Sequence, residues 1–393
     1  MPTDQGRSLS ILKICVEELL TEVWGHKVQL APNATDLKAS GRTQVYRFSL
    51  IEKPVDAPQY VIVKAMPVME DISTASNTAP DNSLQLFFNE WAGLHFLSEI
   101  APHPTIAPRF YAGSKAHKLL VMEDLGTGNG LHHLLLANNP EVAEEAAVQY
   151  AATVGKMHAA TIGKQETFSH IRQELGPAET PDYSWISSTM WKTIHTLDIT
   201  PVAGIENELQ QLTSIMENPG PFLAYTHGDP CPDNILLGTS GKLLDFEFGA
   251  YRHALIEGVY ARMPFPTCWC VGRLPAHVIH RMETSYRAEL AKGCPAALDD
   301  RLFAQAVASA CAYWTIDDCR FLHRHLEQDW QWSPGLATAR QRFLLRFDMA
   351  REAIEASEYL QAIGKTFEQI ASRLRQLLPS EADQMPYYPA FRP

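Results

Sequence analysis

Three oxygen-bearing side chains stand at fixed spacing in one short stretch of the chain, Tyr225–Phe248. Asp229 is followed five residues later by Asn234, and Asp245 comes eleven residues after that. A carboxylate can orient and deprotonate an attacking hydroxyl, and Mg²⁺ takes oxygen ligands. Phosphoryl transfer needs such positioning and charge neutralisation more than covalent chemistry. The spacing therefore predicts a kinase-type site, with Asp229 as the proton acceptor and Asn234 and Asp245 as the metal ligands.

The segment between these side chains has the pattern of a β-hairpin. Residues 235–237 form a short apolar run, residues 238–241 are turn formers, and a second apolar run begins at 243. A hairpin brings its two outer ends together. We therefore expect the two aspartates and the asparagine to meet at one end of it.

The motifs His227-Gly-Asp, Asn234 and Asp245-Phe-Glu247 closely resemble those of the aminoglycoside phosphotransferase family, which includes choline kinase-like and other small-molecule kinases. The resemblance implies an α+β, bilobal protein-kinase-like fold, with a small β-rich N-lobe carrying a covering helix and a larger, mostly helical C-lobe. It implies that His227 supports the loop through hydrogen bonds. Glu247 stands where the family often has an acid, and its role is open between assisting the metal and assisting acceptor amines. The alternative, a chance acidic loop in another α/β protein, does not explain both spacings.

The strand expected to hold nucleotide phosphates is Tyr60–Ala65, in which β-branched residues lead to Lys64. It looks like the Val-Ala-Ile-Lys strand of kinases. A lysine on a buried face needs a partner, because an unpaired buried charge is costly. The resemblance implies ATP phosphates and Glu90, on a helix expected over residues 84–97, as its partners. The alternatives are an exposed lysine on an edge strand and an exposed helix charge.

The remaining nucleotide contacts come from position and resemblance. Residues 38–42 should cover the phosphates, although Gly41 is their only glycine, and a plain hairpin turn is the alternative. The residues expected to pass the adenine and offer it backbone N–H and C=O groups are Met122, Glu123, Asp124 and Leu125.

The order of these landmarks implies an N-lobe over 1–122, a hinge over 123–130 and a C-lobe over 131–393. The catalytic loop lies at 225–248, and an insertion at 163–221 is expected to help form the acceptor site. We expect His158 to be a structural histidine bonded beneath the catalytic loop. The aromatic and proline-rich segment 263–270 either lines the acceptor site or is a plain packed loop.

Composition narrows the classes of partner. The net charge of −12 over 393 residues argues against nucleic acid, whose phosphates call for a basic surface. Leu9–Val23 carries three glutamates and so is not expected to be a signal peptide, and we expect no membrane segment. The seven cysteines are scattered and odd in number, so we expect reduced thiols in a cytoplasmic protein, with Cys231 as a small filler and not a nucleophile.

The sequence thus predicts a phosphotransferase with an alcohol group as acceptor. It would use Mg²⁺ and ATP, GTP not being excluded, to phosphorylate a small molecule such as an antibiotic or another amine- or sugar-like compound. A metabolic kinase for choline, sugars or amino alcohols is the alternative, and a nucleotide-binding pseudokinase with a regulatory role is the alternative of another class. A protein kinase is disfavoured, because Asp-Phe-Gly and Ala-Pro-Glu are absent. The sequence names neither the acceptor nor the oligomeric state.

Overall fold

The computed structural model describes residues 4–38, 43–66, 82–100, 106–177, 180–238 and 240–392. The chain divides into two compact units. The N-terminal unit consists of Met1–Gly128, Glu166–Ala178 and Leu244–Gly249. The C-terminal unit consists of Asn129–Gln165, Glu179–Leu243 and Ala250–Pro393. The domain boundaries drawn from the sequence stay a prediction.

The N-terminal unit is built on an antiparallel five-stranded sheet in the order β1-β2-β3-β5-β4. Its strands are β1 (Gln29–Lys38), β2 (Gln44–Glu52), β3 (Tyr60–Ala65), β4 (Phe110–Ser114) and β5 (Leu119–Glu123). The strand β3 lies at the centre, and every residue of it after Tyr60 is buried. A strand covered on both faces reads as a continuous apolar run, which explains its β-branched sequence.

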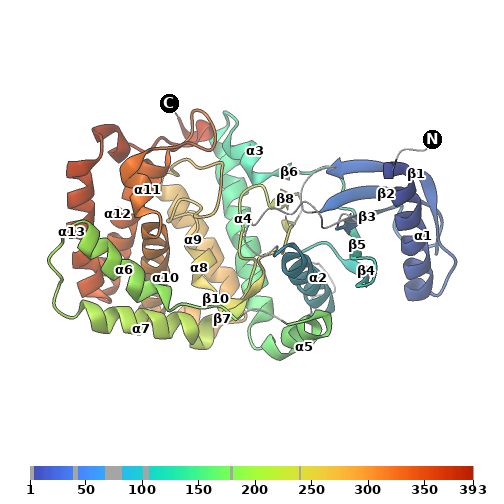
Figure 1. Cartoon of the computed structure of the whole chain (residues 1–393), viewed down its shortest axis with the longest axis horizontal. Coiled ribbons are helices and arrows are strands. Elements are labelled where there is room, and N and C mark those ends of the chain that lie inside the picture. The colour runs from blue at the N-terminus through green and yellow to red at the C-terminus, as the bar shows by residue number, and fades with distance from the viewer. Residues whose placement is uncertain are drawn as a thin grey trace. The chain divides into compact units, whose positions relative to one another are not determined.

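Helix α1 (Asp4–Trp24) covers one face of this sheet (Figure 1). Its Val16 and Leu20 are fully buried in a core that also contains Phe48, Val63 and Val121 from three different strands. The covering helix expected in the small lobe is therefore present, and its apolar stripe is what packs it onto the sheet.

Helix α2 (Ser83–Ile100) packs against β4 of the same sheet. It buries residues on most of its circumference, including Phe87, Glu90 and Trp91. A Cβ at Gly113 of β4 would come within 2.3 Å of the Trp91 indole. Glycine at that position is thus what lets the helix approach the strand closely.

The C-terminal unit is mostly helical. Its longer helices are α4 (Pro140–Thr161), α6 (Trp185–Thr196), α7 (Ile205–Glu217), α9 (Ala276–Leu290), α10 (Asp300–Cys319), α12 (Ala339–Ser357) and α13 (Gln361–Leu377). Helix α4 packs on α9, and α12 packs between α10 and α13 (Figure 1). The shorter helices are α3 (Leu131–Leu135), α8 (Leu255–Gly258) and α11 (Leu322–Glu327), while α5 (Gln165–Leu175) lies almost wholly in the N-terminal unit. None of the helices in the described ranges is long and apolar enough to cross a bilayer.

Two small antiparallel sheets carry the loops of the predicted site. One has the order β6-β8-β9, and the other pairs β7 with β10. Their strands are β6 (Asn129–Gly130), β7 (Leu223–Thr226), β8 (Ile235–Leu237), β9 (Lys242–Leu243) and β10 (Ala250–His253). The pairing of Ile235 with Leu243 confirms the predicted hairpin. The predicted α+β class, with a small antiparallel sheet unit and a larger helical unit, is confirmed.

Candidate active site

Lys64, Glu90 and Asp245 form one ion-pair cluster in the N-terminal unit. Lys64 Nζ lies 2.5 Å from Glu90 Oε2 and 2.7 Å from Asp245 Oδ1. The side chain of Lys64 is 9% exposed and that of Glu90 2%, whereas Asp245 is 35% exposed. The alternative of an exposed lysine on an edge strand is therefore wrong, because β3 is a central strand. The alternative of an exposed helix charge is also wrong, because α2 buries Glu90. Their role toward a nucleotide stays a prediction.

Charge keeps this lysine protonated. Burial disfavours its ammonium form, but the carboxylates of Glu90 and Asp245 outweigh burial and raise the pKa of Lys64 above its ordinary value. Burial raises the pKa of Glu90 to about 7; Lys64 opposes this shift, and the carboxylates of Asp245 and Glu247 add to it. Lys64 is thus a fixed positive charge on the inner strand of the sheet.

The chain at Asp245 has an unusual backbone. Its φ of 67° lies in the left-handed region, which few residues other than glycine adopt and which aspartate tolerates better than most. A turn follows, in which Gly249 N–H donates to Phe246 O at 2.9 Å, and Phe246 is fully buried. Such conformations persist where the surroundings fix them, often at functional sites. Here the buried phenylalanine anchors the residue that carries the carboxylate to Lys64.

Two residues that the sequence analysis missed hold this segment against α2. Asn89 Nδ2 donates to Glu247 O at 3.2 Å, and Arg172 Nε of α5 donates to Asn89 Oδ1 at 2.9 Å. Arg172 is only 1% exposed and also donates to Gly176 O. The only signal in the sequence was the position of Asn89, directly before the expected glutamate.

In the C-terminal unit, a buried acid lies beneath the loop that carries Asp229. Gly228 has a φ of 86°, which favours glycine, and its N–H donates to Glu257 Oε1 at 2.5 Å. Glu257 Oε2 lies 3.0 Å from His158 Nε2, whose Nδ1 lies 2.9 Å from Tyr286 Oη. His158 thus reaches the loop through Glu257. The sequence analysis missed Glu257, for which only its position after the motif could have been a signal.

Electrostatics indicate that this acid is charged. Burial by itself would raise the pKa of Glu257, but the hydrogen bond and charge of His158 and the N–H of Gly228 lower it below its ordinary value. His227 is fully buried, and its Nδ1 accepts from Asp229 N–H at 3.3 Å. A buried carboxylate therefore fixes the backbone immediately before Asp229.

The Asp229 carboxylate and Asn234 are tied to each other. Asn234 Nδ2 donates to Asp229 O at 2.9 Å and lies 3.4 Å from Asp229 Oδ2. Thr267 Oγ1 donates to Asp229 Oδ1. Because the Asn234 amide donates through nitrogen, its oxygen is the atom that suits a hard cation. Asp229 and Asn234 belong to the C-terminal unit and Asp245 to the N-terminal unit, so their predicted meeting stays a prediction.

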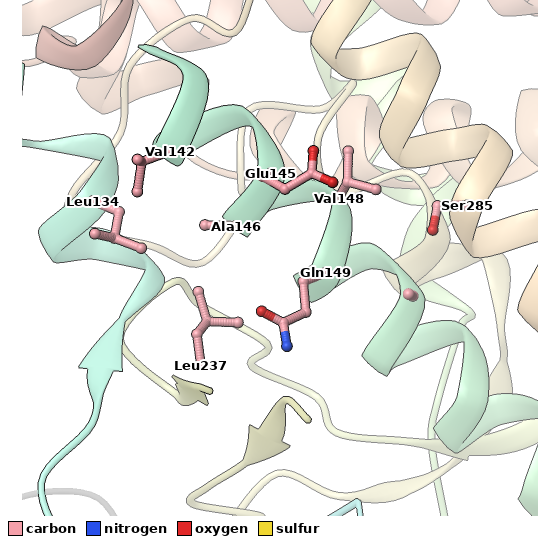
Figure 2. A pocket seen from close by; sticks show the side chains of 9 residues that line it. Leu134, Val142, Glu145, Ala146, Val148, Gln149, Leu237 and Ser285 are labelled. Carbon is pink, nitrogen blue, oxygen red and sulfur yellow. The ribbon is translucent and has the colours of Figure 1, made fainter. Parts of the chain in front are cut away.

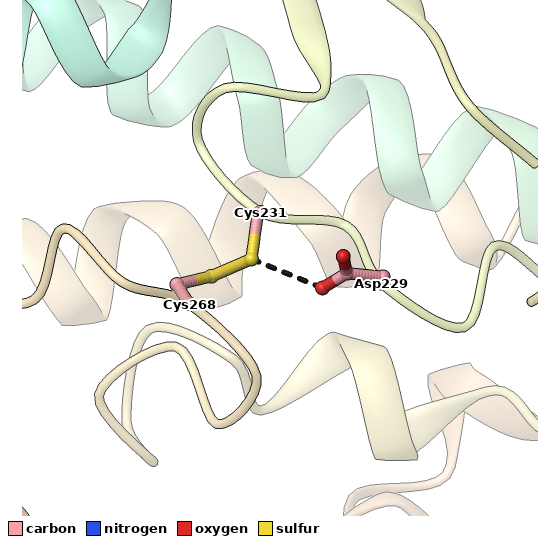
Figure 3. Close-up of side chains that lie close together, drawn as sticks. All are labelled: Asp229, Cys231 and Cys268. Atoms are coloured by element: carbon pink, nitrogen blue, oxygen red, sulfur yellow. Dashed lines mark hydrogen bonds between the residues drawn. A yellow bond between two sulfur atoms is a disulfide. The ribbon is translucent and has the colours of Figure 1, made fainter. Parts of the chain in front are cut away.

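One expectation about the cysteines is wrong. Cys231 and Cys268 form a disulfide, with Cα atoms 5.4 Å apart and a sequence separation of 37 positions (Figure 3). Scattered spacing could not reveal this pair, because tertiary folding alone brings the 263–270 segment beside the loop. The other five cysteines are buried thiols, as expected.

The predicted hinge residues lie at the end of the sheet. Met122 and Glu123 pair with β3, and Glu123 N–H donates to Arg109 O at 2.8 Å. The Asp124 carboxylate accepts from Arg47 Nε at 2.6 Å and from Gly126 N–H at 2.9 Å. This carboxylate thus serves the fold, which agrees with a hinge that would use its backbone. Leu125 follows Asp124 in the chain, and Gly41 lies outside the described residues.

A surface cavity of about 430 Å³ lies elsewhere in the C-terminal unit, between α3, α4, β8 and α9 (Figure 2). Its lining is largely apolar, with Leu134, Val142 and Leu237 at its walls and Glu145 and Gln149 as polar members. None of the predicted catalytic, nucleotide-binding or metal-binding residues lines this cavity, although Leu237 belongs to the predicted catalytic loop.

Comparison with known proteins agrees with the motifs. Residues 87–269 match the family described as "Phosphotransferase enzyme family", which confirms the resemblance found in the sequence. No curated protein sequence matches the chain. The description of the matched family agrees with a phosphotransferase.

Several solved structures are similar to the chain at low identity. A choline kinase from Cryptosporidium parvum Iowa II has 10% identity and a TM-score of 0.42, covering 89% of this chain and 91% of its own. The streptomycin–ATP–APH(2")-IIa ternary complex has 12% identity and a TM-score of 0.42, with coverages of 78% and 91%. The amicoumacin kinase hAmiN, in complex with AMP-PNP, Ca²⁺ and Ami, has 11% identity and a TM-score of 0.42, with coverages of 95% and 96%.

Proposed function

We propose, on the premise that residues 87–269 match the phosphotransferase enzyme family, that this protein transfers the γ-phosphoryl group of ATP to a hydroxyl of a small molecule. The single observation that carries the proposal is the hydrogen-bonded Asp229–Asn234 pair, at the spacing that kinases use for their catalytic base and metal ligand. The buried Lys64–Glu90 pair supplies the second element that the reaction needs.

In this proposal Asp229 orients the acceptor hydroxyl and accepts its proton. A base of this kind contributes about 10²- to 10⁴-fold to a rate. The carboxylate is held by Asn234 and Thr267, while Glu257 fixes the preceding glycine. Rigid support of this kind suits a base, because a small misplacement of the reacting groups lowers the rate sharply.

The charged residues of the N-terminal unit would bind the nucleotide. Lys64 stays protonated, and a desolvated ammonium pairs strongly with phosphate oxygens. Glu90 would fix the direction of the lysine side chain. The backbone of residues 122–125 would meet the adenine of ATP, with GTP as the alternative phosphoryl donor.

The donor set fits a divalent metal ion. Asn234 offers an amide oxygen and Asp245 a carboxylate, which are hard ligands suited to Mg²⁺. When bound, the metal would neutralise the charge of the nucleotide phosphates. Glu247, two residues after Asp245, would assist either this metal or an acceptor amine.

The acceptor class follows from weaker observations. The net charge of −12 suits a cationic molecule. Among the similar structures, one is a choline kinase and another holds streptomycin with ATP. Amine- and sugar-bearing hydroxyl compounds are therefore the acceptors to test first, with an antibiotic-modifying kinase and a metabolic kinase as the two outcomes.

A screen of ATP consumption tests the proposal. Purified protein with ATP and Mg²⁺ is offered aminoglycosides, macrolides, nucleoside antibiotics, choline-like amines and sugars, and ADP release is measured. The variant Asp229→Ala should lose turnover by about 10²-fold or more while still binding nucleotide. The matched control is Asp56→Ala, which removes an exposed acid between β2 and β3. Full phosphoryl transfer by Asp229→Ala would count against the assignment.

A further inference from the structure

The disulfide between Cys231 and Cys268 touches the proposed base directly. Cys231 Sγ lies 3.0 Å from Asp229 Oδ1, and Figure 3 shows the sulfur pointing at this oxygen. A carboxylate oxygen of Asp229 and the sulfur atoms of Cys231 and Cys268 all lie within 4.8 Å of one another. A change in the bonding of the two sulfurs would therefore change the immediate surroundings of the Asp229 carboxylate.

The residue before Cys268 binds the same carboxylate oxygen. Thr267 donates its hydroxyl hydrogen to Asp229 Oδ1, and its oxygen lies 3.2 Å from the hydroxyl of buried Tyr260. The disulfide thus ties the loop of Asp229 to the residue next to Thr267, whose hydroxyl occupies the position that a substrate hydroxyl would need at this oxygen.

The segment on the far side of the disulfide is anchored to α12. Arg342 donates to Cys268 O at 3.0 Å and to Pro266 O at 2.7 Å, and Arg346 donates to Met263 O at 3.2 Å. Both arginines are buried, at 4% and 3% exposure. Hydrogen bonds between a buried charged group and backbone carbonyls are costly to break. The 263–268 segment is therefore a fixed support, and the disulfide ties the loop of Asp229 to it.

We propose that Cys231 and Cys268 are a reversible thiol–disulfide site that controls Asp229, with the disulfide form as the less active state. This inference rests on the proposed function of Asp229 as the base. In the disulfide form Thr267 is held on the carboxylate oxygen. After reduction the two sulfurs separate to non-bonded distance, and the loop is released from its tether.

The chemical change is a two-electron exchange with a small thiol. A first thiolate attacks one sulfur of the pair, the S–S bond breaks, and a mixed disulfide forms with loss of the other cysteine as a thiolate. A second thiolate attacks the mixed disulfide and releases the second cysteine. Two molecules of the small thiol become its disulfide, and the two cysteines end as thiols after taking up two protons. The reverse reaction needs the small-molecule disulfide as the oxidant.

Position distinguishes this pair from the remaining thiols. Cys270 lies only two residues beyond Cys268, yet it is buried outside the disulfide, and burial raises the pKa of its thiol to about 12. A thiol with so high a pKa is a poor nucleophile at neutral pH. Cys270 is therefore the matched control for Cys268.

The test compares the full-length protein after treatment with dithiothreitol or with oxidised glutathione. Thiols counted under denaturing conditions should number seven after reduction and five after oxidation, because the chain has seven cysteines and one disulfide. ADP release from ATP and Mg²⁺, with water as the acceptor, should be at least about tenfold faster in the reduced protein, since a misplacement of about 1 Å can cost about 10²-fold. Cys268→Ser should respond to neither treatment, whereas Cys270→Ser should respond as the wild type does.

The remaining outcomes count against either the redox control of Asp229 or the proposed function itself. Equal rates at thiol counts of seven and five would overturn the proposal, as would a faster oxidised form or a count of seven after oxidation. If no form hydrolyses ATP and the acceptor screen is also negative, the proposed function fails. Amide hydrogen exchange of residues 225–237 then tests the tether alone: faster exchange after reduction in the wild type but not in Cys268→Ser supports it, and unchanged exchange refutes it.

Discussion

Replacement of Glu257 tests whether a buried carboxylate positions the catalytic loop. Its two oxygens serve Gly228 N–H at 2.5 Å and His158 Nε2 at 3.0 Å, and the residue is 3% exposed. Glu257→Ala would leave both partners buried without an acceptor. Breaking a buried, hydrogen-bonded charge pair costs about 3–5 kcal/mol, so we expect this loss in the free energy of unfolding.

The conservative variant should separate charge from shape. Glu257→Gln keeps an oxygen for Gly228 N–H but loses the charge. Hydrogen bonds to charged groups are worth about 1.5–3 kcal/mol and neutral ones about 0.5–1.5. The difference is about 1–1.5 kcal/mol per bond, so the expected loss of stability over two bonds is about 2–3 kcal/mol. Because Gly228 precedes Asp229, we also expect kcat to fall by about tenfold or more in both variants.

Urea unfolding and ADP release measure the two effects. The pKa of Glu257 is lowered in the folded protein, so its contribution is present above the ordinary value of 4.5 and is lost as pH falls below it. The stability difference between wild type and Glu257→Gln should shrink accordingly in acid. Glu283→Gln is the control, because Glu283 binds Arg262 at 2.7 Å in the same unit but does not contact the loop. Unchanged stability of Glu257→Ala, or a stability loss with full kcat, would refute the reasoning.

Three further predictions concern the predicted metal ligand and the N-terminal unit. Asn234→Ala should raise the Mg²⁺ concentration needed for half-maximal ADP release by about tenfold or more; an unchanged metal titration would remove Asn234 from the site. The pKa of Glu90 is raised to about 7, so the charge that fixes Lys64 is lost as pH falls through 7. The loss of ATP affinity from pH 8 to pH 6 should therefore be larger in the wild type than in Glu90→Gln, in which only the phosphate of ATP titrates. Calorimetric titration at the two pH values checks this, and an identical pH dependence in both proteins would contradict it. Asn89→Ala should lower the free energy of unfolding by about 1–3 kcal/mol, because buried Arg172 loses an acceptor; urea unfolding measures it, with no loss as the contrary result.

Much of the site could be predicted from the sequence because local spacing reports local geometry. The β8–β9 hairpin followed from two apolar runs and a turn, and the central strand with Lys64 followed from its β-branched residues. The pairing of Lys64 with Glu90 needed the resemblance as well, because they are 26 positions apart in the sequence and only packing of α2 on the sheet brings their side chains to 2.5 Å.

The sequence by itself determined the residue types of the motifs and their spacing. Covalent bonds along the chain limit the distance between residues that are only a few positions apart. The tertiary structure alone decided which distant groups support them: Glu257 under Gly228, Asn89 on the Asp-Phe-Glu segment, and Cys231 bonded to Cys268. The physical reason is that a buried polar group must find a partner wherever the packed chain supplies one. Spacing along the sequence carries no information about that choice.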